Sequence, residues 1–176
     1  LVERRREMYR AALYKEDFLE LRKQVKNLDG KLARRLGEVN KLFLELKREC
    51  EDYQILVSVS HIVLKLMNLL TEMERFLEEP SDDELRENVL SLYFQVRSFV
   101  NIHDILDENY VIYSELEENG RFKIKLFCVN PAVNLQEYLE HGSGTVFFSA
   151  TLLPIHYYKS LLSVEKDDYA IYAQSS

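Results

Sequence analysis

"KEDFLELRKQVKNLDGKLARRLGEVNKLFLEL", residues 15–46, is the stretch that decides the fold. Its apolar residues recur every three or four positions, which is the period of an amphipathic helix; they are Phe18, Leu21, Val25, Leu28, Leu32, Leu36, Val39, Phe43 and Leu46. Glu16 and Asp17 suit the positive end of a helix dipole at the start of the run. Gly30 weakens the run, so we expect the helix to split or kink there.

Two further helical segments come after this stretch. One is expected over about 55–78, because apolar residues keep the helical period until Pro80 ends it. The next begins at "SDDE", residues 81–84, where Ser81 as N-cap and Glu84 three residues later predict a capping box. This helix continues to about Leu106. Three helices of such length predict an antiparallel bundle over residues 15–107.

The apolar period changes from helical to alternating after residue 107. The segments "NYVIYSEL" (109–116) and "RFKIKLFCVN" (121–130) predict two strands, and "EENG" (117–120) predicts the hairpin turn between them. The remaining elements expected are a short strand or helix end at 10–14, a short helix at 131–142, a buried strand at 144–150, a short helix at 154–162 and a last strand at 168–173. The expected fold class is therefore α+β: an antiparallel helical bundle joined to a small α/β segment.

Charge is unevenly distributed along the 176 residues. The formal net charge is −7, which excludes a general basic signature for nucleic acid. Residues 1–50 nevertheless carry 14 Lys and Arg against 9 Asp and Glu, whereas residues 51–176 carry 9 against 21. A basic half can steer an anionic partner to one face. The alternative interpretation is an ordinary solvated helix surface.

Cysteine use and hydropathy favour a cytoplasmic protein without membrane contact. Cys50 and Cys128 are far apart in the sequence and are expected to be buried, reduced thiols. The most apolar helical stretch, "HIVLKLMNLL" (61–70), is too short to span a bilayer and carries Lys65 in its middle. We find no signal peptide pattern.

The common catalytic patterns are missing from the sequence. The four histidines are scattered, and the pair His103 and Asp107 is more typical of a surface contact than of two metal ligands, so no metal site is expected. The five glycines do not form a phosphate loop. Ser149 lacks the glycines of a nucleophile elbow. Most of the eleven Tyr and nine Phe are assigned to packing, although aromatic residues beside Lys or Arg also occur where single strands of nucleic acid bind.

The stretch "GTVFFSATLLPIHYYKSLL", residues 144–162, carries the sharpest motif in the chain. Two hydroxyls and an alanine stand at the end of a buried apolar strand, and a proline comes shortly after them. This stretch resembles motif III of superfamily 2 helicases, in particular the XPD/DinG family of ATP-dependent DNA helicases. In that family a Gly-Thr, an apolar strand, Ser-Ala-Thr-Leu and a proline come in this order.

The start of the chain resembles the same family. "LVERRREMYRAAL", residues 1–13, is similar to the segment directly after the Walker B box, Asp-Glu-Ala-His-Asn, in these proteins. A helical insertion, the arch domain, lies there between Walker B and motif III. The resemblance thus implies four parts: 1–14 as the return from motor domain 1, 15–107 as an arch-like domain, 108–162 as the end of the RecA-like motor domain 1, and 163–176 as the start of motor domain 2.

The resemblance implies a function for the longer protein. That protein would use ATP and Mg²⁺ to move along single-stranded DNA, and Ser149, Ala150 and Thr151 would couple hydrolysis to movement; their plainer interpretation is as caps of the following turn. The fragment itself lacks the phosphate loop and the Walker B box, so we expect it to be inactive and to bind no cofactor. Many members hold an iron–sulfur cluster, which Cys50 and Cys128 do not match.

The positive charge of the first predicted helix is the one feature that indicates a DNA-binding surface there. The candidate residues for DNA phosphates are Arg22, Lys23, Lys26, Arg34 and Arg35. Two rival functions stay open. One is a helical protein-interaction module that docks a partner on the acidic face of its third helix. The other is an unrelated helical adaptor in which Ser-Ala-Thr occurs by chance.

Overall fold

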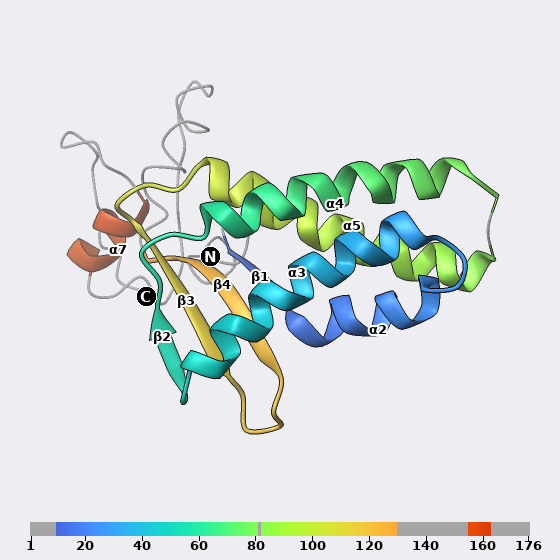
Figure 1. Ribbon diagram of the computed structural model, residues 1–176. Coiled ribbons are helices and arrows are strands. Elements are labelled where there is room, and N and C mark those ends of the chain that lie inside the picture. The colour runs from blue at the N-terminus through green and yellow to red at the C-terminus, as the bar shows by residue number, and fades with distance from the viewer. Residues whose placement is uncertain (1–9, 81, 130–154, 163–176) are drawn as a thin grey trace, which may run out of the picture. The chain divides into compact units, whose positions relative to one another are not determined.

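The structure is a computed structural model that describes residues 10–80, 82–129 and 155–162. The chain divides into two compact units, Arg10–Phe127 and Leu1–Tyr9 with Cys128–Ser176. The first unit combines four helices with a four-stranded sheet (Figure 1). The expectation of a mixed α and β fold is confirmed. In the second unit the structure describes α7, Ile155–Leu162, where the sequence predicted a short helix.

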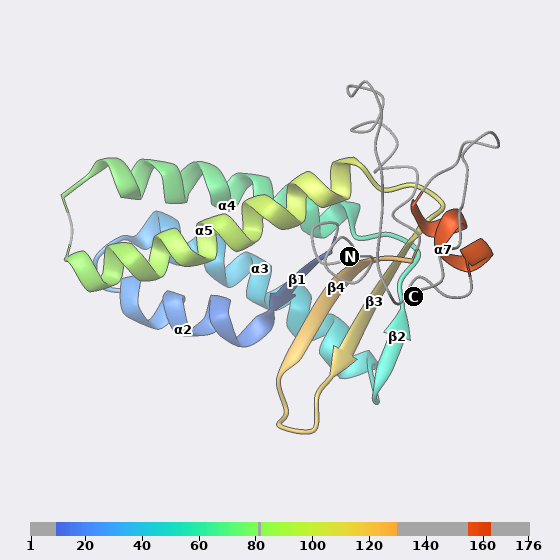
Figure 2. The same ribbon diagram turned by 180° about the vertical axis from the view of Figure 1, so that it is seen from behind.

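The four helices of the first unit form an antiparallel bundle. They are α2 (Lys15–Val25), α3 (Gly30–Glu49), α4 (Ser60–Glu78) and α5 (Asp83–Asp104). Successive helices run in opposite directions, as Figures 1 and 2 show, and each packs on the next, with α5 returning to α2. The bundle therefore has one helix more than the sequence predicted. The long run of residues 15–46 splits, as Gly30 led us to expect.

Asp29 explains where the long run splits. Its carboxylate accepts hydrogen bonds from the backbone N–H groups of Lys31 and Leu32, both at 3.0 Å, so it caps the N-terminus of α3. Burial opposes the charge on Asp29, but these bonds and the guanidinium of Arg75 lower its pKa overall. The contact with Arg75 also joins the last turn of α4 to the loop between α2 and α3.

The sheet has the strand order β1-β4-β3-β2. The strands are β1 (Ala11–Tyr14), β2 (Tyr53–Ile55), β3 (Tyr110–Leu116) and β4 (Phe122–Cys128). β1 runs antiparallel to β4, with Ala11 opposite Leu126, and β2 runs antiparallel to β3, with Gln54 opposite Ser114. The predicted hairpin of β3 and β4 is confirmed. Its turn uses Gly120 at φ 79°, a left-handed conformation that favours glycine.

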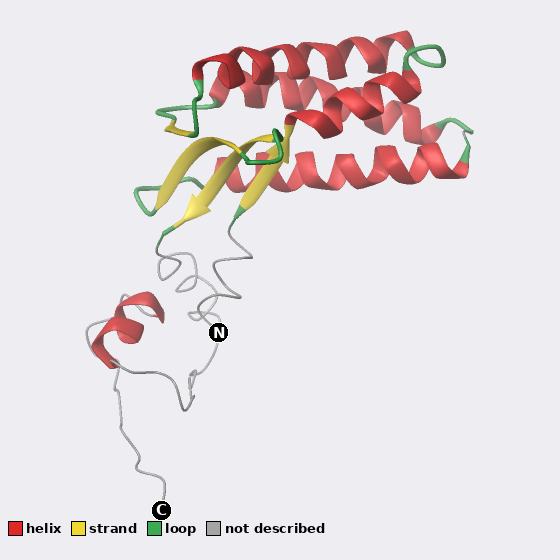
Figure 3. Cartoon of the chain, turned by 90° about the horizontal axis from the view of Figure 1, so that it is seen from below, coloured by secondary structure: helices red, strands yellow, loops and turns green. Residues whose placement is uncertain are grey.

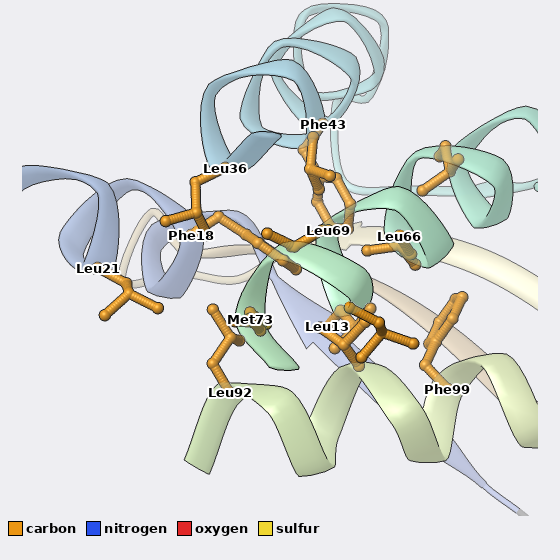
Figure 4. Packing of buried hydrophobic residues seen from close by; sticks show 14 of the residues in the cluster. Leu13, Phe18, Leu21, Leu36, Phe43, Leu66, Leu69, Met73, Leu92 and Phe99 are labelled. Carbon is orange, nitrogen blue, oxygen red and sulfur yellow. The ribbon is translucent and has the colours of Figure 1, made fainter. Parts of the chain in front are cut away.

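One face of the sheet shares the core of the bundle. The side chains of Leu13, Phe122 and Ile124 are fully buried and belong to the same apolar cluster as the helices. The ring centroids of Phe18 and Phe43 lie 5.4 Å apart, and those of Phe43 and Phe122 lie 6.3 Å apart. These ring contacts link α2, α3 and β4. Figure 4 shows Leu13 of β1 among side chains from α4 and α5. Figure 3 shows that the sheet lies at one end of the bundle.

Three local expectations were wrong. Leu28 is 71% exposed instead of buried, because α2 ends at Val25 and Leu28 lies in the loop before α3. The helix expected over about 55–78 begins at Ser60, and Ile55 belongs instead to β2, which pairs with β3. The N-cap of α5 is Asp82, whose carboxylate accepts from the N–H of Leu85, and not Ser81, which lies outside the described residues.

The compact unit is wider than the helical segment expected at 15–107. It begins at Arg10 and ends at Phe127, so it includes β1 and most of the hairpin. The elements expected at 131–142, 144–150 and 168–173 lie outside the described residues. Among the helices that the structure describes, none combines the length and the apolar character needed to cross a membrane.

Candidate functional site

The motif Ser149, Ala150 and Thr151 lies outside the described residues. The site that the structure does describe is the set of basic residues on α2 and α3. Arg22 and Lys23 are exposed on α2, and Lys26 is the residue at its C-terminal cap. Arg34 and Arg35 lie on α3. The two helices are neighbours, so the structure brings the five predicted residues onto one pair of packed helices.

The α2 residues differ in the groups that they contact. The guanidinium of Arg22 lies across α3 at Gly37, where a Cβ atom would stand 3.1 Å from the Arg22 Nε. Gly37 therefore leaves room for this side chain. Lys23 forms an exposed ion pair with Glu20 at 3.4 Å, which contributes little to stability. Lys26 is exposed, and the structure shows no ion pair for it among the described residues.

Glu38 organises the basic residues of α3. Its carboxylate lies 3.2 Å from Arg35, 3.4 Å from Lys65 of α4 and 3.9 Å from Arg34. Burial opposes its charge, but the bonds from Arg35 and Lys65 lower the pKa of Glu38 overall. The Arg35 side chain is 25% exposed, whereas that of Arg34 is 65% exposed. Arg34 is therefore the better placed of the two to reach a phosphate, because Arg35 is held by Glu38, three residues further along α3.

The prediction from sequence missed two exposed lysines on α3. Lys31 and Lys41 stand three residues before and seven residues after Arg34, so they share its face of the helix. Helical spacing from Arg34 was the signal that would have found them. The same face also carries Glu38 and Glu45, so its charges alternate in sign. Such alternation is typical of a solvated helix face and weakens the case for a continuous phosphate track.

The outer face of the sheet carries a second group of aromatic and basic residues. Lys125 of β4 lies 5.8 Å from the ring centroid of Tyr113 and 5.4 Å from that of Phe127. Stacked rings beside a cation are one way to hold single-stranded nucleic acid. The alternation in "RFKIKLF", residues 121–127, places Lys123, Lys125 and Phe127 on this face and was the signal available in the sequence.

Most of the remaining charge on that face is paired. Lys123 contacts Glu115 at 2.9 Å and Glu117 at 2.8 Å, and the hydroxyl of Tyr14 donates to Glu117 at 2.8 Å. The bonds from Lys123 and Tyr14 lower the pKa of Glu117 to about 2. The guanidinium of Arg121 lies 4.0 Å above the Tyr14 ring and pairs with Asp17. These residues form a structural network that fixes the hairpin turn on the start of α2.

The described residues contain no arrangement of three or more His, Cys, Asp or Glu side chains that is suited to a metal ion. His103 and Asp107 do not act as a pair. The Nδ1 of His103 lies 3.7 Å from Asp104, while Asp107 accepts from Asn109. Cys50 is a buried free thiol whose sulfur donates weakly to the carbonyl of Asp52 at 3.5 Å. Among the residues that the structure describes, no second cysteine lies beside Cys50 to hold an iron–sulfur cluster with it.

No protein-family model and no curated protein matches the chain. Its function is therefore inferred from its own motifs and geometry. The geometry offers exposed cations on α2 and α3, an aromatic and basic outer sheet face, and the pairing of the first strand with the last strand of the sheet.

Proposed function

We propose that the chain is a segment of an ATP-dependent DNA helicase of the XPD/DinG kind. In this proposal residues 10–127 form a unit inserted in the first motor domain, and residues 144–154 carry motif III. The longer protein would hydrolyse ATP to move along single-stranded DNA. Ser149, Ala150 and Thr151 would couple that hydrolysis to movement.

The pairing of β1 with β4 is the observation that supports an inserted unit. Ala11 stands opposite Leu126 in antiparallel register, so the chain enters and leaves the unit on adjacent strands. A unit whose two ends lie side by side can be placed in a loop of a host domain without separating the strands that flank it. The Ser-Ala-Thr motif comes shortly after this unit in the sequence, which is the order that the proposal requires.

The ATP site itself would belong to residues outside this chain. Phosphates of a nucleotide need the backbone amides and the lysine of a phosphate loop, and the sequence has neither in the required spacing. The chain's own residues would supply the inserted unit and the coupling motif. Hydroxyls at the end of a strand can exchange hydrogen-bond partners between two arrangements, and a bound nucleotide can favour one of them.

Coupling by Ser149 and Thr151 can be tested in the longer protein. We expect Ser149→Ala with Thr151→Ala to retain single-stranded-DNA-stimulated ATP hydrolysis and to lose most strand separation. The matched control is Ser143→Ala, which removes a hydroxyl just before the motif. Equal loss of both activities would indicate that the motif serves folding. Full strand separation in the double variant would exclude a coupling role.

The DNA surface can be tested with one charge reversal and a matched control. Arg34→Glu should weaken binding of single-stranded DNA and reduce the salt slope by roughly 0.7 for each phosphate that is no longer neutralised. Arg86→Glu makes the same charge change on α5 and should leave the slope unchanged. Both variants are measured by fluorescence anisotropy of a labelled oligonucleotide across a salt series. Identical slopes for both variants would exclude Arg34 from the DNA surface.

A protein-interaction module is the alternative function. Its acidic surface at the start of α5 consists of exposed Asp83, Glu84 and Glu87, as the sequence suggested. The alternating charges on α3 also favour this alternative over a phosphate track. Single-stranded DNA affinity separates the two functions: a chain that binds no oligonucleotide at low salt and whose longer protein hydrolyses no ATP would be an interaction module.

A further inference from the structure

The strand β2 forms one edge of the sheet, and its second side is not paired with any other strand that the structure describes. The N–H of Leu56 donates to the carbonyl of Ile112 at 2.9 Å, and the carbonyl of Asp52 accepts from the N–H of Leu116 at 2.7 Å. Gln54 lies between these two residues, opposite Ser114. Residues 52, 54 and 56 therefore direct their backbone groups to β3.

Tyr53 and Ile55 direct their backbone groups the other way. In an antiparallel ladder, alternate residues bond to the same neighbour and the residues between them face the opposite side. The N–H and carbonyl groups of Tyr53 and Ile55 thus form a short row of donors and acceptors along the open side of β2. We call this row, with the side chains of Tyr53, Ile55 and Val57, the β2 edge.

The length of β2, three residues, is one protection of an edge strand, but its outward-facing residues Tyr53 and Ile55 carry neither a charge nor a proline. Natural edges are commonly covered or carry charges, prolines or bulges. Tyr53 is 68% exposed, Ile55 is 67% exposed and Val57 is fully exposed. Tyr53 and Ile55 also line an open groove of about 400 Å³ together with Asp52, Val111, Tyr113 and Glu115. An exposed apolar edge beside such a groove is typical of a place where another strand adds.

The charge near the β2 edge indicates the kind of strand that fits. Glu49, Glu51 and Asp52 precede β2, all three are exposed, and none forms an ion pair or a side-chain hydrogen bond among the described residues. Glu115, in contrast, is already paired with Lys123. A cationic side chain would therefore be attracted to the Glu49–Asp52 end of the edge. A second copy of this chain would instead bring another acidic run to the same edge.

We propose that the β2 edge binds an extended, basic and apolar peptide segment of another protein by strand addition. The segment's backbone pairs with Tyr53 and Ile55. Alternate apolar side chains lie beside Tyr53 and Ile55 on the outer face, and a Lys or Arg lies next to Glu51 and Asp52. The site is on β2 and is independent of the helicase proposal.

Ile55→Pro is the sharpest variant for testing this site. Proline removes the outward N–H of residue 55, while the bonds of residues 54 and 56 to β3 stay, and proline is tolerated on the solvent side of an edge strand. Ile55→Val is the matched control, since it keeps the N–H and most of the apolar surface. Asp52→Lys tests the charge preference separately.

The experiment selects random twelve-residue peptides displayed on phage against the 176-residue chain and then measures Kd for synthetic copies of the winners. We expect alternating apolar residues with Lys or Arg at one end. Binding should weaken about tenfold in Ile55→Pro and less than about twofold in Ile55→Val. Asp52→Lys should weaken the same peptides and improve binding of versions in which Glu replaces Lys or Arg.

Other results would overturn the proposal. These are failure to enrich any peptide, enriched peptides without the basic and apolar pattern, or equal binding to the wild type and Ile55→Pro. If Ile55→Pro does not fold, wild-type chain is tested with peptides methylated at alternate backbone nitrogens, and unchanged affinity contradicts strand addition. A concentration-dependent dimer in sedimentation that Ile55→Pro abolishes would assign the edge to a second copy of the chain instead.

Discussion

The two edge strands of the sheet, β1 and β2, differ in how far their side chains are buried. β1 pairs along its whole length with β4, packs beside α5 and buries Ala11 and Leu13 in the core. β2 has three residues, pairs with β3 and exposes its apolar side chains. The edge through which the chain enters the unit is thus packed against a helix of the bundle. The opposite edge keeps Tyr53 and Ile55 exposed.

This contrast separates stability from binding. The packed edge, β1, contributes to the folded state because its side chains leave water and contact two helices. The β2 edge contributes little on its outer side, where Tyr53 and Ile55 stay exposed. Substitutions at β1 should therefore act on the free energy of unfolding, whereas substitutions on the outer side of β2 should act on association.

The largest expected effect is at Leu13. Leu13→Ala should lower the free energy of unfolding by about 2–5 kcal/mol, because the fully buried side chain leaves a cavity among α4, α5 and the sheet. Ile55→Ala in β2 is the matched control and should change it by less than about 0.5 kcal/mol. Urea unfolding followed by circular dichroism measures both. Equal losses would contradict the assignment of β1 as the packed edge.

Proline substitutions sharpen the comparison within β2 itself. Gln54→Pro removes an N–H that faces β3 and should cost about 1–3 kcal/mol, since its partner carbonyl is left unsatisfied. Ile55→Pro removes an N–H that faces outward and should cost less than about 1 kcal/mol. The same urea titrations compare the two variants. A larger loss for Ile55→Pro would mean that residue 55, and not 54, faces β3.

A smaller effect is expected at the end of β1. Tyr14→Phe removes the hydrogen bond from the Tyr14 hydroxyl to Glu117 and should cost about 1 kcal/mol at pH 7. Tyr53→Phe in β2 is the control, because Tyr53 is exposed, and should have no measurable effect. Thermal unfolding of the two variants and the wild type distinguishes them.

The Tyr14 effect should depend on pH in a defined direction. The pKa of Glu117 falls from its ordinary value of 4.5 to about 2 in the folded chain. A carboxylate with a lowered pKa stabilises the fold above its unfolded pKa, and this stabilisation is lost as the pH falls through the folded value. The difference between Tyr14→Phe and the wild type should therefore be full above pH 4.5 and shrink toward pH 2. A difference that grows on acidification would contradict the network.

The helices were predictable because their apolar period is strong and local. Phe18, Leu21, Leu36 and Phe43 are buried as the period required. The residues at which α3 and α5 begin were less predictable, because each start depends on one capping side chain. Asp29 and Asp82 compete with nearby residues of similar propensity, and a tertiary contact with Arg75 helps to select Asp29. The hairpin was predictable because alternation and a glycine turn agree.

β2 and the DNA candidates were harder to predict for a different reason. A strand of three residues has no period of its own and exists through its pairing with β3, which is distant in sequence. The basic residues of α2 and α3 were found from their charge, but charge alone does not show which of them form ion pairs with carboxylates. Glu38 holds Arg35 close to α3, and the sequence offered no means to rank Arg34 above Arg35.

The most direct test of the helicase proposal is the coding sequence upstream of Leu1, read from the messenger RNA. The proposal predicts Asp-Glu-Ala-His-Asn immediately before the chain and a phosphate loop further upstream. It also predicts an open reading frame that continues past Ser176 into a second motor domain. A start codon at Leu1, or unrelated residues there, would contradict the proposal and leave the first unit as a protein-binding module.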